Sequence, residues 1–115
     1  MENNKADLEN GIIQELRRGT ITLAVLSQLK QSQYGYSLIV LMNEKGFDIE
    51  ASTLYPLLRR LEKQGILESS WNTDGSKPRK YYQLSEQGKD VYLKLCTAWS
   101  DLNTVVSNLI NEEDE

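Results

Sequence analysis

The chain has 115 residues and a mass of 13.2 kDa, the size of one average domain, which excludes a multidomain enzyme. Its 13 basic and 17 acidic residues give a formal charge of −4, so the chain is not a uniformly basic nucleic-acid binder, although this total does not exclude a local basic patch. The absence of histidine and the single cysteine, Cys96, exclude histidine-based triads, histidine zinc sites and an internal disulfide.

No apolar run approaches the length of about 18 residues that a membrane span needs, and the N-terminus lacks a basic segment followed by an apolar one. We therefore expect a soluble, cytoplasmic protein with a reduced thiol and no membrane partner. We also expect no cofactor and no enzyme activity, because no nucleophile–base pair, metal set or phosphate-binding loop is present.

The charge is distributed unevenly along the chain. Residues 1–11 carry a net charge of −2 and residues 85–115 a net charge of −5, whereas residues 12–84 carry +3. A polyanion should therefore meet the middle of the chain.

Helical spacing of apolar residues extends from Leu8 to Leu29 and is interrupted at Gly19. It predicts a short arm followed by a firmer helix from about Thr20. A polar break at 31–35 precedes a second short helix, predicted over 36–44.

The segment 51–65 predicts a third helix. Pro56 is tolerated only near a helix start, which places the N-cap at Ser52 or Thr53, and Gly65 supplies the stop. The buried stripe is then formed by leucines, namely Leu54, Leu57, Leu58 and Leu61. The opposite face shows polar, aromatic and basic side chains, namely Ser52, Thr53, Tyr55, Arg59 and Lys63.

Residues 66–71 and 80–84 flank a turn-rich segment, 72–78, and predict a two-stranded hairpin with a basic tip. Residues 85–110 predict a long final helix of roughly 39 Å. Its apolar positions are spaced alternately by three and four residues and form one narrow seam, namely Tyr92, Leu95, Trp99, Leu102, Val106 and Leu109. The chain before it is too small to cover this seam, so we expect a second copy to cover it as a dimer interface.

The predicted fold class is therefore mainly α with a small β hairpin: a winged helix-turn-helix followed by a long C-terminal dimerisation helix. In this order the third helix enters the major groove of DNA by its N-terminal residues, and the wing contacts flanking phosphates. The residues expected to contact DNA are Ser52, Thr53, Tyr55, Arg59, Lys77, Arg79 and Lys80. Each has an alternative: the two hydroxyls as helix caps only, Tyr55 as core, and the basic side chains as an ordinary solvated surface.

Two strings, Thr53 to Gly65 (TLYPLLRRLEKQG) and Pro78 to Gly88 (PRKYYQLSEQG), resemble the PadR family of bacterial transcriptional regulators. Arg18-Gly19-Thr20 and Tyr34-Gly35-Tyr36 also match its opening, so the resemblance covers about Leu8 to Ile110. It implies a homodimeric repressor that binds an inverted-repeat operator and is released by a small molecule. It also implies that Tyr36, Ser52, Thr53, Tyr55, Lys77 and Arg79 contact DNA. Tyr34, where many members have His, and Lys77, where many have Arg, depart from the family pattern, so the operator sequence should not be borrowed from relatives.

The single C-terminal helix resembles the short subfamily that includes a lactococcal multidrug-binding regulator. That relative brackets flat aromatic guests with a Trp that matches Trp99, which predicts a small aromatic or cationic ligand at the dimer centre. The candidate ligand-binding residues are Trp99, Leu95, Ala98 and Asp101. The alternative is that Trp99 is a closely packed dimer anchor with no cavity, and Cys96 is interpreted as a passive small hydrophobic residue.

We expect two regions: residues 1–84 form the DNA-binding domain with its N-terminal helical arm, and residues 85–115 form the dimerisation helix and an acidic tail. The alternative function is a winged-helix protein-interaction module without sequence-specific DNA binding. The salt dependence of binding separates the two, because several phosphate contacts give a steep slope.

Overall fold

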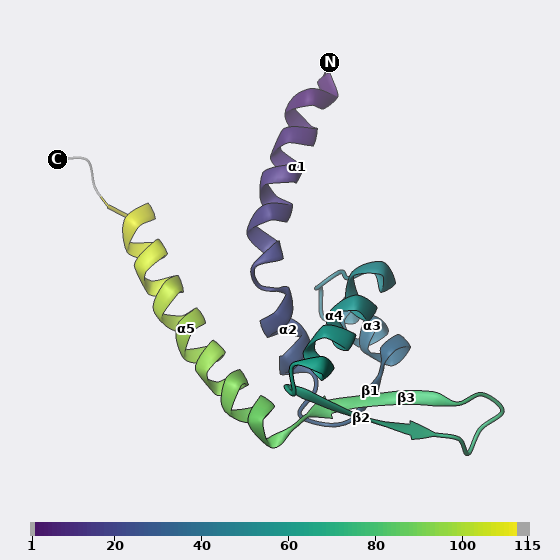
Figure 1. Ribbon diagram of the computed structural model, residues 1–115. Coiled ribbons are helices and arrows are strands. Elements are labelled where there is room, and N and C mark those ends of the chain that lie inside the picture. Colours follow the sequence, from purple (N-terminus) through teal and green to yellow (C-terminus); the bar gives the residue numbers. More distant parts are fainter. Residues whose placement is uncertain (1, 113–115) are drawn as a thin grey trace.

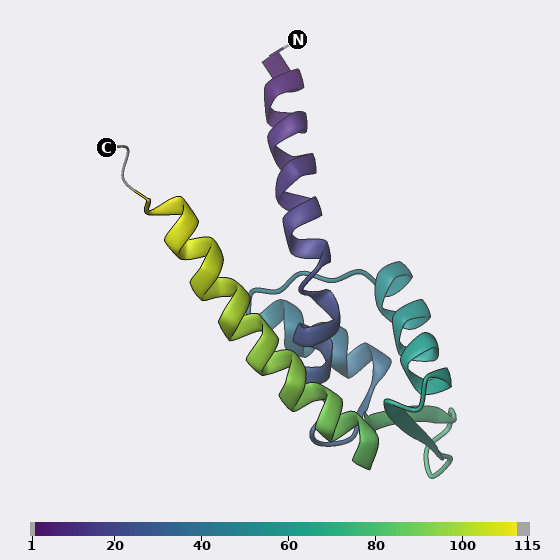
Figure 2. The same ribbon diagram turned by 60° about the vertical axis from the view of Figure 1, so that its left-hand side comes forward.

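The computed structural model describes residues 2–112; the end of the acidic tail, 113–115, lies outside the described residues. In chain order the elements are α1 (Glu2–Arg18), α2 (Ile21–Ser27), β1 (Gln33–Tyr34), α3 (Gly35–Glu44), α4 (Ala51–Lys63), β2 (Leu67–Asn72), β3 (Arg79–Leu84) and α5 (Glu86–Ile110). Elements α2 to β3 form a body from which α1 and α5 project on the same side (Figures 1 and 2). The mainly α winged helix-turn-helix with a long C-terminal helix is thus confirmed.

The N-terminal segment differs from the prediction in the lengths of its two parts. The break at Gly19 and Thr20 is present, but the arm is a helix of 17 residues, whereas α2 has only seven. The Thr20 hydroxyl and amide both donate to the Arg17 carbonyl near the end of α1, at 2.7 and 2.9 Å. Arg17 and Arg18 also lie in the last turn of α1, where positive charge favours the helix.

The sheet has three strands rather than the two that the sequence predicts. The hairpin pairs β2 with β3 from Leu67 opposite Leu84 to Asn72 opposite Arg79. On the other edge of β3 lies β1, in the segment interpreted as a polar break, so the strand order is β1-β3-β2. This strand is only two residues long, too short for an alternating pattern, and a cross-strand contact supports it because the rings of Tyr34 and Tyr81 lie 5.5 Å apart.

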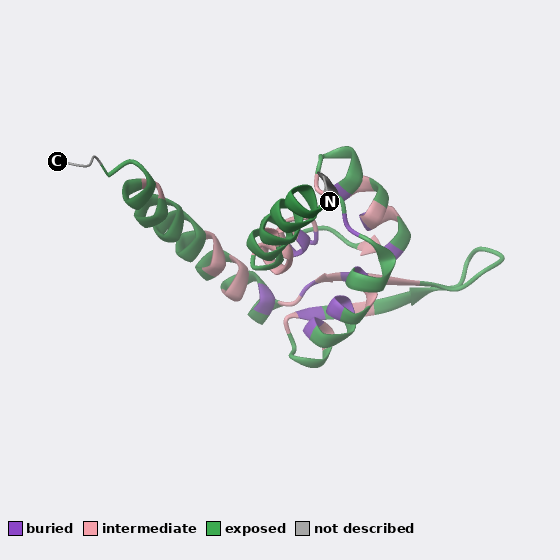
Figure 3. Cartoon of the chain, turned by 90° about the horizontal axis from the view of Figure 1, so that it is seen from above, coloured by how far each residue is buried: buried purple, intermediate pink, exposed green. Residues whose placement is uncertain are grey.

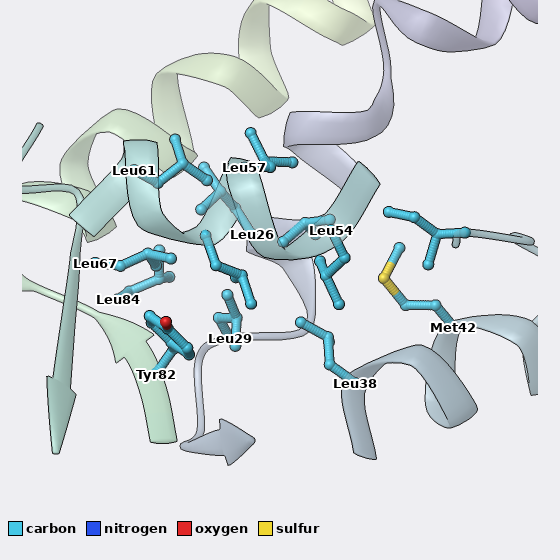
Figure 4. Close-up of a cluster of buried hydrophobic side chains, with 13 residues drawn as sticks. Leu26, Leu29, Leu38, Met42, Leu54, Leu57, Leu61, Leu67, Tyr82 and Leu84 are labelled. Carbon is cyan, nitrogen blue, oxygen red and sulfur yellow. The ribbon is translucent and has the colours of Figure 1, made fainter. Parts of the chain in front are cut away.

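The hydrophobic core lies between the helices of the body and the sheet (Figure 4). Helix α4 contributes the predicted leucine stripe, and all four leucines are buried. The buried residues that complete the core come from α2, α3, the turns and the strands, namely Val25, Leu26, Leu29, Leu38, Met42, Ile49, Leu67, Tyr82 and Leu84. This core fixes α4 against the sheet and leaves its other face outward.

Helices α1 and α5 remain largely uncovered (Figure 3). Leu8 is 66% exposed on α1, and Leu102 is 58% exposed on α5. The start of α5 is fastened to the body by Ser85, whose hydroxyl donates to the Gly65 carbonyl at 2.6 Å and accepts from the Gly88 amide at 2.9 Å. Within residues 2–112, no helix combines the length and the apolar character that crossing a bilayer requires.

Candidate nucleic-acid interface

Helix α4 presents an exposed polar face over the buried leucine stripe. Ser52, Thr53 and Arg59 are all exposed on this face. The side chains of Ser52 and Thr53 lie in the first turn, where free backbone amides carry the positive end of the helix dipole. The face therefore offers two hydroxyls, a guanidinium and a positive helix end to a partner.

The helix begins earlier than the predicted N-cap at Ser52 or Thr53. The N-cap is Glu50, whose carbonyl accepts from the amides of Thr53 and Leu54 at 3.0 and 2.9 Å, and no side chain caps the helix. Packing fixes the entry instead, because Ile49 is buried in the core. The alternative that the two hydroxyls serve only as caps is therefore wrong.

Pro56 is the sixth residue of α4 and lies deeper in the helix than expected. The amide that a proline lacks would have bonded to the carbonyl of Ser52, four residues earlier. Because Ser52 is exposed, the loss of this helical hydrogen bond lies on the outer side of α4 rather than in the core.

Tyr55 is half-buried and joins α4 to the start of α3. A Cβ added to Gly35 would lie 2.8 Å from the Cζ and Oη atoms of Tyr55, so the ring rests directly on the Gly35 backbone. Next to it, Tyr36 is 63% exposed at the N-terminal end of α3. Tyr36 and the start of α4 are therefore held together through Tyr55.

Arg79 and Lys80 extend to opposite faces of the wing. The Arg79 guanidinium lies 4.8 Å from the centroid of the Tyr34 ring, on the face that also carries Tyr81. On the opposite face, Lys80 lies 5.2 Å from the Tyr82 ring and donates to Glu62 of α4 at 2.9 Å.

Glu62 links α4 to both strands of the hairpin. Its carboxylate accepts from the Ser69 hydroxyl on β2 and from Lys80 on β3. The Ser69 hydrogen bond, followed by the one from Lys80, lowers the pKa of Glu62, and the hydrogen bond with Glu62 raises the pKa of Lys80. Lys80, expected to contact DNA, therefore has an internal partner that compensates its charge.

The tip of the wing, residues 73–78, has few contacts of its own. The Asp74 amide donates to Asn72 Oδ1 at 2.9 Å and closes a local turn. Lys77 is exposed beside it and makes no hydrogen bond or ion pair within the described residues. Its charge is therefore free for a polyanion.

Two features of this surface escaped the sequence analysis. Trp71, near the outer end of β2, is 64% exposed. Arg17 at the end of α1 donates to the Asp48 carbonyl at 3.0 Å and lies 4.9 Å from the Phe47 ring, which ties α1 to the turn before α4. A large aromatic residue at the outer end of a predicted strand was the available signal for Trp71, whereas the Arg17 contact spans 31 residues and left no signal.

An apolar hollow of about 350 Å³ lies between α2 and α5. Its α5 side is formed by Tyr92, Cys96 and Trp99, and its α2 side includes Leu23 and Ala24. Two hydroxyls complete the lining, namely those of Thr20 and Ser27. Both donate to backbone carbonyls of their own segment, so the hollow offers mainly apolar surface and one large indole.

The four residues expected to bind a ligand do not meet within one chain. Ala98 and Asp101 line a different, shallow hollow on another side of α5, together with Lys94. Leu95 packs against the core of its own chain. Only Trp99 lines the apolar hollow, and Cys96, interpreted as passive, lies beside it.

The α5 seam divides into a covered and an uncovered half. Tyr92 and Leu95 pack against the body, and the hydrogen bond that the Tyr92 hydroxyl donates to Cys96, together with burial, raises the pKa of Tyr92. Beyond them the seam is open: Trp99, Leu102, Val106 and Leu109 are 46%, 58%, 42% and 64% exposed. Within the described residues no group of three or more potential metal ligands gathers.

The sequence matches the family model described as "Transcriptional regulator PadR-like family" over residues 22–94. A crystal structure of a PadR family transcriptional regulator from Eggerthella lenta superposes with a TM-score of 0.90 at 44% identity, covering 95% of this chain and 97% of that one. A PadR-like transcriptional regulator from Bacillus cereus gives a TM-score of 0.75 at 27% identity, covering 86% and 99%. An uncharacterized protein from Lysinibacillus sphaericus is 31% identical over 83 residues, 68% of this chain and 75% of the relative.

Proposed function

Because this chain belongs to the PadR-like family of transcriptional regulators, it is a DNA-binding regulator, and we propose that it is a repressor. It binds an inverted-repeat operator as a homodimer and releases it when a small planar or hydrophobic compound binds. The observation that carries the proposal is the uncapped, outward-facing start of α4 beside a basic wing.

The DNA-contacting surface comprises the α4 face, the start of α3 and the wing. Ser52, Thr53 and Arg59 enter the major groove, since only this groove admits a helix and distinguishes all base pairs. Tyr36 and Tyr55 flank them. Lys77 and Arg79 contact phosphates, whereas Lys80 braces the wing through Glu62.

The dimer forms through α5, within residues 85–115, and through α1. The outer half of the α5 seam is uncovered, and Leu8, Ile12 and Leu16 of α1 are 66%, 59% and 75% exposed. Both helices project from the body and are largely exposed (Figure 3). A second copy of the chain, which presents the same apolar faces, is the partner that covers them best. The pairing places the two α4 helices one helical turn of DNA apart, roughly 34 Å.

The ligand binds in the hollow between α2 and α5, with Trp99 as its aromatic wall. The lining contains no carboxylate, and Lys30 lies 5.4 Å from the Tyr92 ring, so a neutral aromatic compound fits it better than a cation. A guest there changes the angle between α5 and the body. Because α5 holds the dimer and the body holds α4, this change moves the two α4 helices out of register with successive turns of the operator.

Operator binding is tested with a duplex of about 30 base pairs that the wild-type protein selects from a random library. Lys77→Ala should weaken binding and reduce the slope of log K against log salt by about 0.9, because one phosphate contact is lost. Thr53→Ala should weaken binding and relax base preference without changing the slope. Lys45→Ala, at the opposite end of α3 from Tyr36, is the charge-matched control and should leave both unchanged.

Failure to select any duplex, or a shallow salt slope in the wild type, would contradict DNA repression. It would favour a winged-helix module that binds an acidic protein with the same surface. A regulator of transcription acts where the DNA is, so we place this protein in the cytoplasm.

The ligand site is tested with a neutral planar probe, coumarin, and a cationic one, ethidium. In a Trp71→Phe protein the emission of Trp99 alone should change with the neutral probe, and Trp99→Ala should lose binding of that probe. An unaltered affinity of Trp99→Ala would remove the pocket assignment and favour the alternative that Trp99 only anchors the dimer.

A further inference from the structure

Trp71 occupies an unusual position for a large aromatic residue. It is 64% exposed, although Trp ordinarily buries most of its surface. It lies one residue before the end of β2. The outer part of the hairpin formed by β2 and β3 extends beyond the helices (Figure 1). Within the described residues no aromatic or cation–π partner covers the ring.

The indole lies on the face of the wing that is turned toward α4. Its cross-strand partner is Lys80, and side chains alternate along a strand, so Trp71, Ser69 and Lys80 share one face. Ser69 and Lys80 both bond to Glu62 of α4, which identifies this face. Trp71 therefore lies two residues beyond Ser69 on the same face, between the hydrogen bonds to Glu62 of α4 and the basic tip of the hairpin.

The surroundings of Trp71 favour a polyanion over an acidic or apolar protein surface. Residues 69–80 carry three basic residues and one acidic residue, in a chain whose total charge is negative. An indole combines a flat apolar face with one N–H donor, which matches a deoxyribose ring beside a phosphate oxygen. Trp71 lies along the hairpin between the contacts with Glu62 of α4 and Lys77 at the tip, so a DNA backbone that runs from α4 to Lys77 comes close to it.

We propose that Trp71 is a DNA-contacting residue that packs against the sugar–phosphate backbone between the groove entered by α4 and the wing tip. This inference rests on the proposed function. The contact is apolar with one hydrogen bond, so it adds affinity without releasing counterions. Glu62, Ser69 and Lys80 act as positioning residues, since they hold the strand that carries the indole.

The chain has two tryptophans, so single-tryptophan proteins report on each site separately. In Trp99→Phe the remaining Trp71 should be open to acrylamide quenching in the free protein and become several-fold less quenched when the selected duplex is added. In Trp71→Phe the remaining Trp99 should respond little to the same duplex. Trp71→Ala should raise the Kd for the duplex about tenfold and leave the salt slope unchanged. Ser70→Ala, an exposed neighbour directed to the other face, should bind like the wild type.

Three results would overturn the inference while operator binding by the wild type stands. Trp71 could remain equally quenched on the duplex, Trp71→Ala could bind as tightly as the wild type, or Trp71 could already be shielded in the free protein. The last result would assign the indole to an interface between copies. Absence of any selected duplex for the wild type is a different result, because it overturns the proposed function itself.

Discussion

At the junction between the body and α5, we predict that replacing Gly88 by Ala destabilises the protein, although helix propensity alone predicts the opposite. Ala is about 1 kcal/mol more favourable than Gly inside a helix, so Gly→Ala normally stabilises. At Gly88, in the first turn of α5, a Cβ would instead lie 2.9 Å from the Ile66 carbonyl carbon and closer still to its oxygen. That carbonyl is held in place because it accepts from the Ser85 amide at 3.0 Å, while the Ser85 hydroxyl donates to the neighbouring Gly65 carbonyl at 2.6 Å.

The change in the free energy of unfolding is estimated from the displacement of α5 that the added Cβ requires. Relieving the clash displaces the start of α5 and strains or breaks the two hydrogen bonds that Ser85 donates to the Ile66 and Gly65 carbonyls, each worth about 1 kcal/mol. Overpacking costs about 1–3 kcal/mol more, and the propensity gain offsets about 1 kcal/mol. We therefore expect Gly88→Ala to lower the free energy of unfolding by about 3 kcal/mol, a large share of the stability of a small domain.

The assay is urea unfolding followed by far-UV circular dichroism, with all variants at one protein concentration, because the stability of any protein that self-associates depends on it. Gly11→Ala is the matched control: Gly11 lies within α1 with nothing within 4 Å of the added Cβ. It should gain up to about 1 kcal/mol. A Gly88→Ala protein as stable as the wild type would refute the close approach of α5 to Ile66.

Three further expectations concern the contacts around α4 and the seam. The pKa of Glu62 lies below its ordinary value of 4.5, so its stabilising effect is present above that value and is lost as the pH falls through the folded-state pKa. Glu62→Gln should thus lower the free energy of unfolding by about 1 kcal/mol at neutral pH, and urea titrations in acid should show a smaller difference from the wild type. A difference that stays constant with pH would contradict the stabilising contacts of Glu62 with Ser69 and Lys80. Arg17→Ala should lower stability by about 1 kcal/mol more than Arg18→Ala, because only Arg17 bonds to the turn before α4, and equal losses would exclude this tie. Leu102→Asp should give a monomer by sedimentation with its helical circular dichroism retained, whereas a persisting dimer would place the interface elsewhere.

Local signals predicted the elements that end in special residues. Gly65 predicted the end of α4, and it indeed has a φ of +80° that favours glycine. Ser85 predicted the start of α5 and is its N-cap. The leucine period predicted which face of α4 is buried, since packing on one side of a helix repeats every three or four residues.

The sequence predictions were wrong or incomplete where contacts between distant parts of the chain determine the local structure. Strand β1 is two residues long and forms by pairing with β3, so it is too short for an alternating sequence pattern to predict it. The start of α4 is fixed by the burial of Ile49 rather than by a capping hydroxyl. Lys80 and Glu62 are 18 residues apart and meet only when the hairpin folds under α4.

The α5 side of the hollow beside Trp99 could have been predicted from the sequence of α5 alone. Tyr92, Cys96 and Trp99 are spaced by four and three residues and therefore share a helix face, whereas Ala98 is rotated by about 100° from Trp99 despite being adjacent in sequence. The opposite wall on α2 could not be read, because the pairing of α2 with α5 is a property of the fold.

The central claim is that two copies, joined through α5 and α1, place two α4 helices on one duplex. The mass of the protein–operator complex, measured by sedimentation with a labelled duplex at micromolar protein, tests it most directly. The account predicts two chains per duplex and none at high salt. One chain per duplex, or a duplex that sediments unchanged in dilute salt, would contradict it.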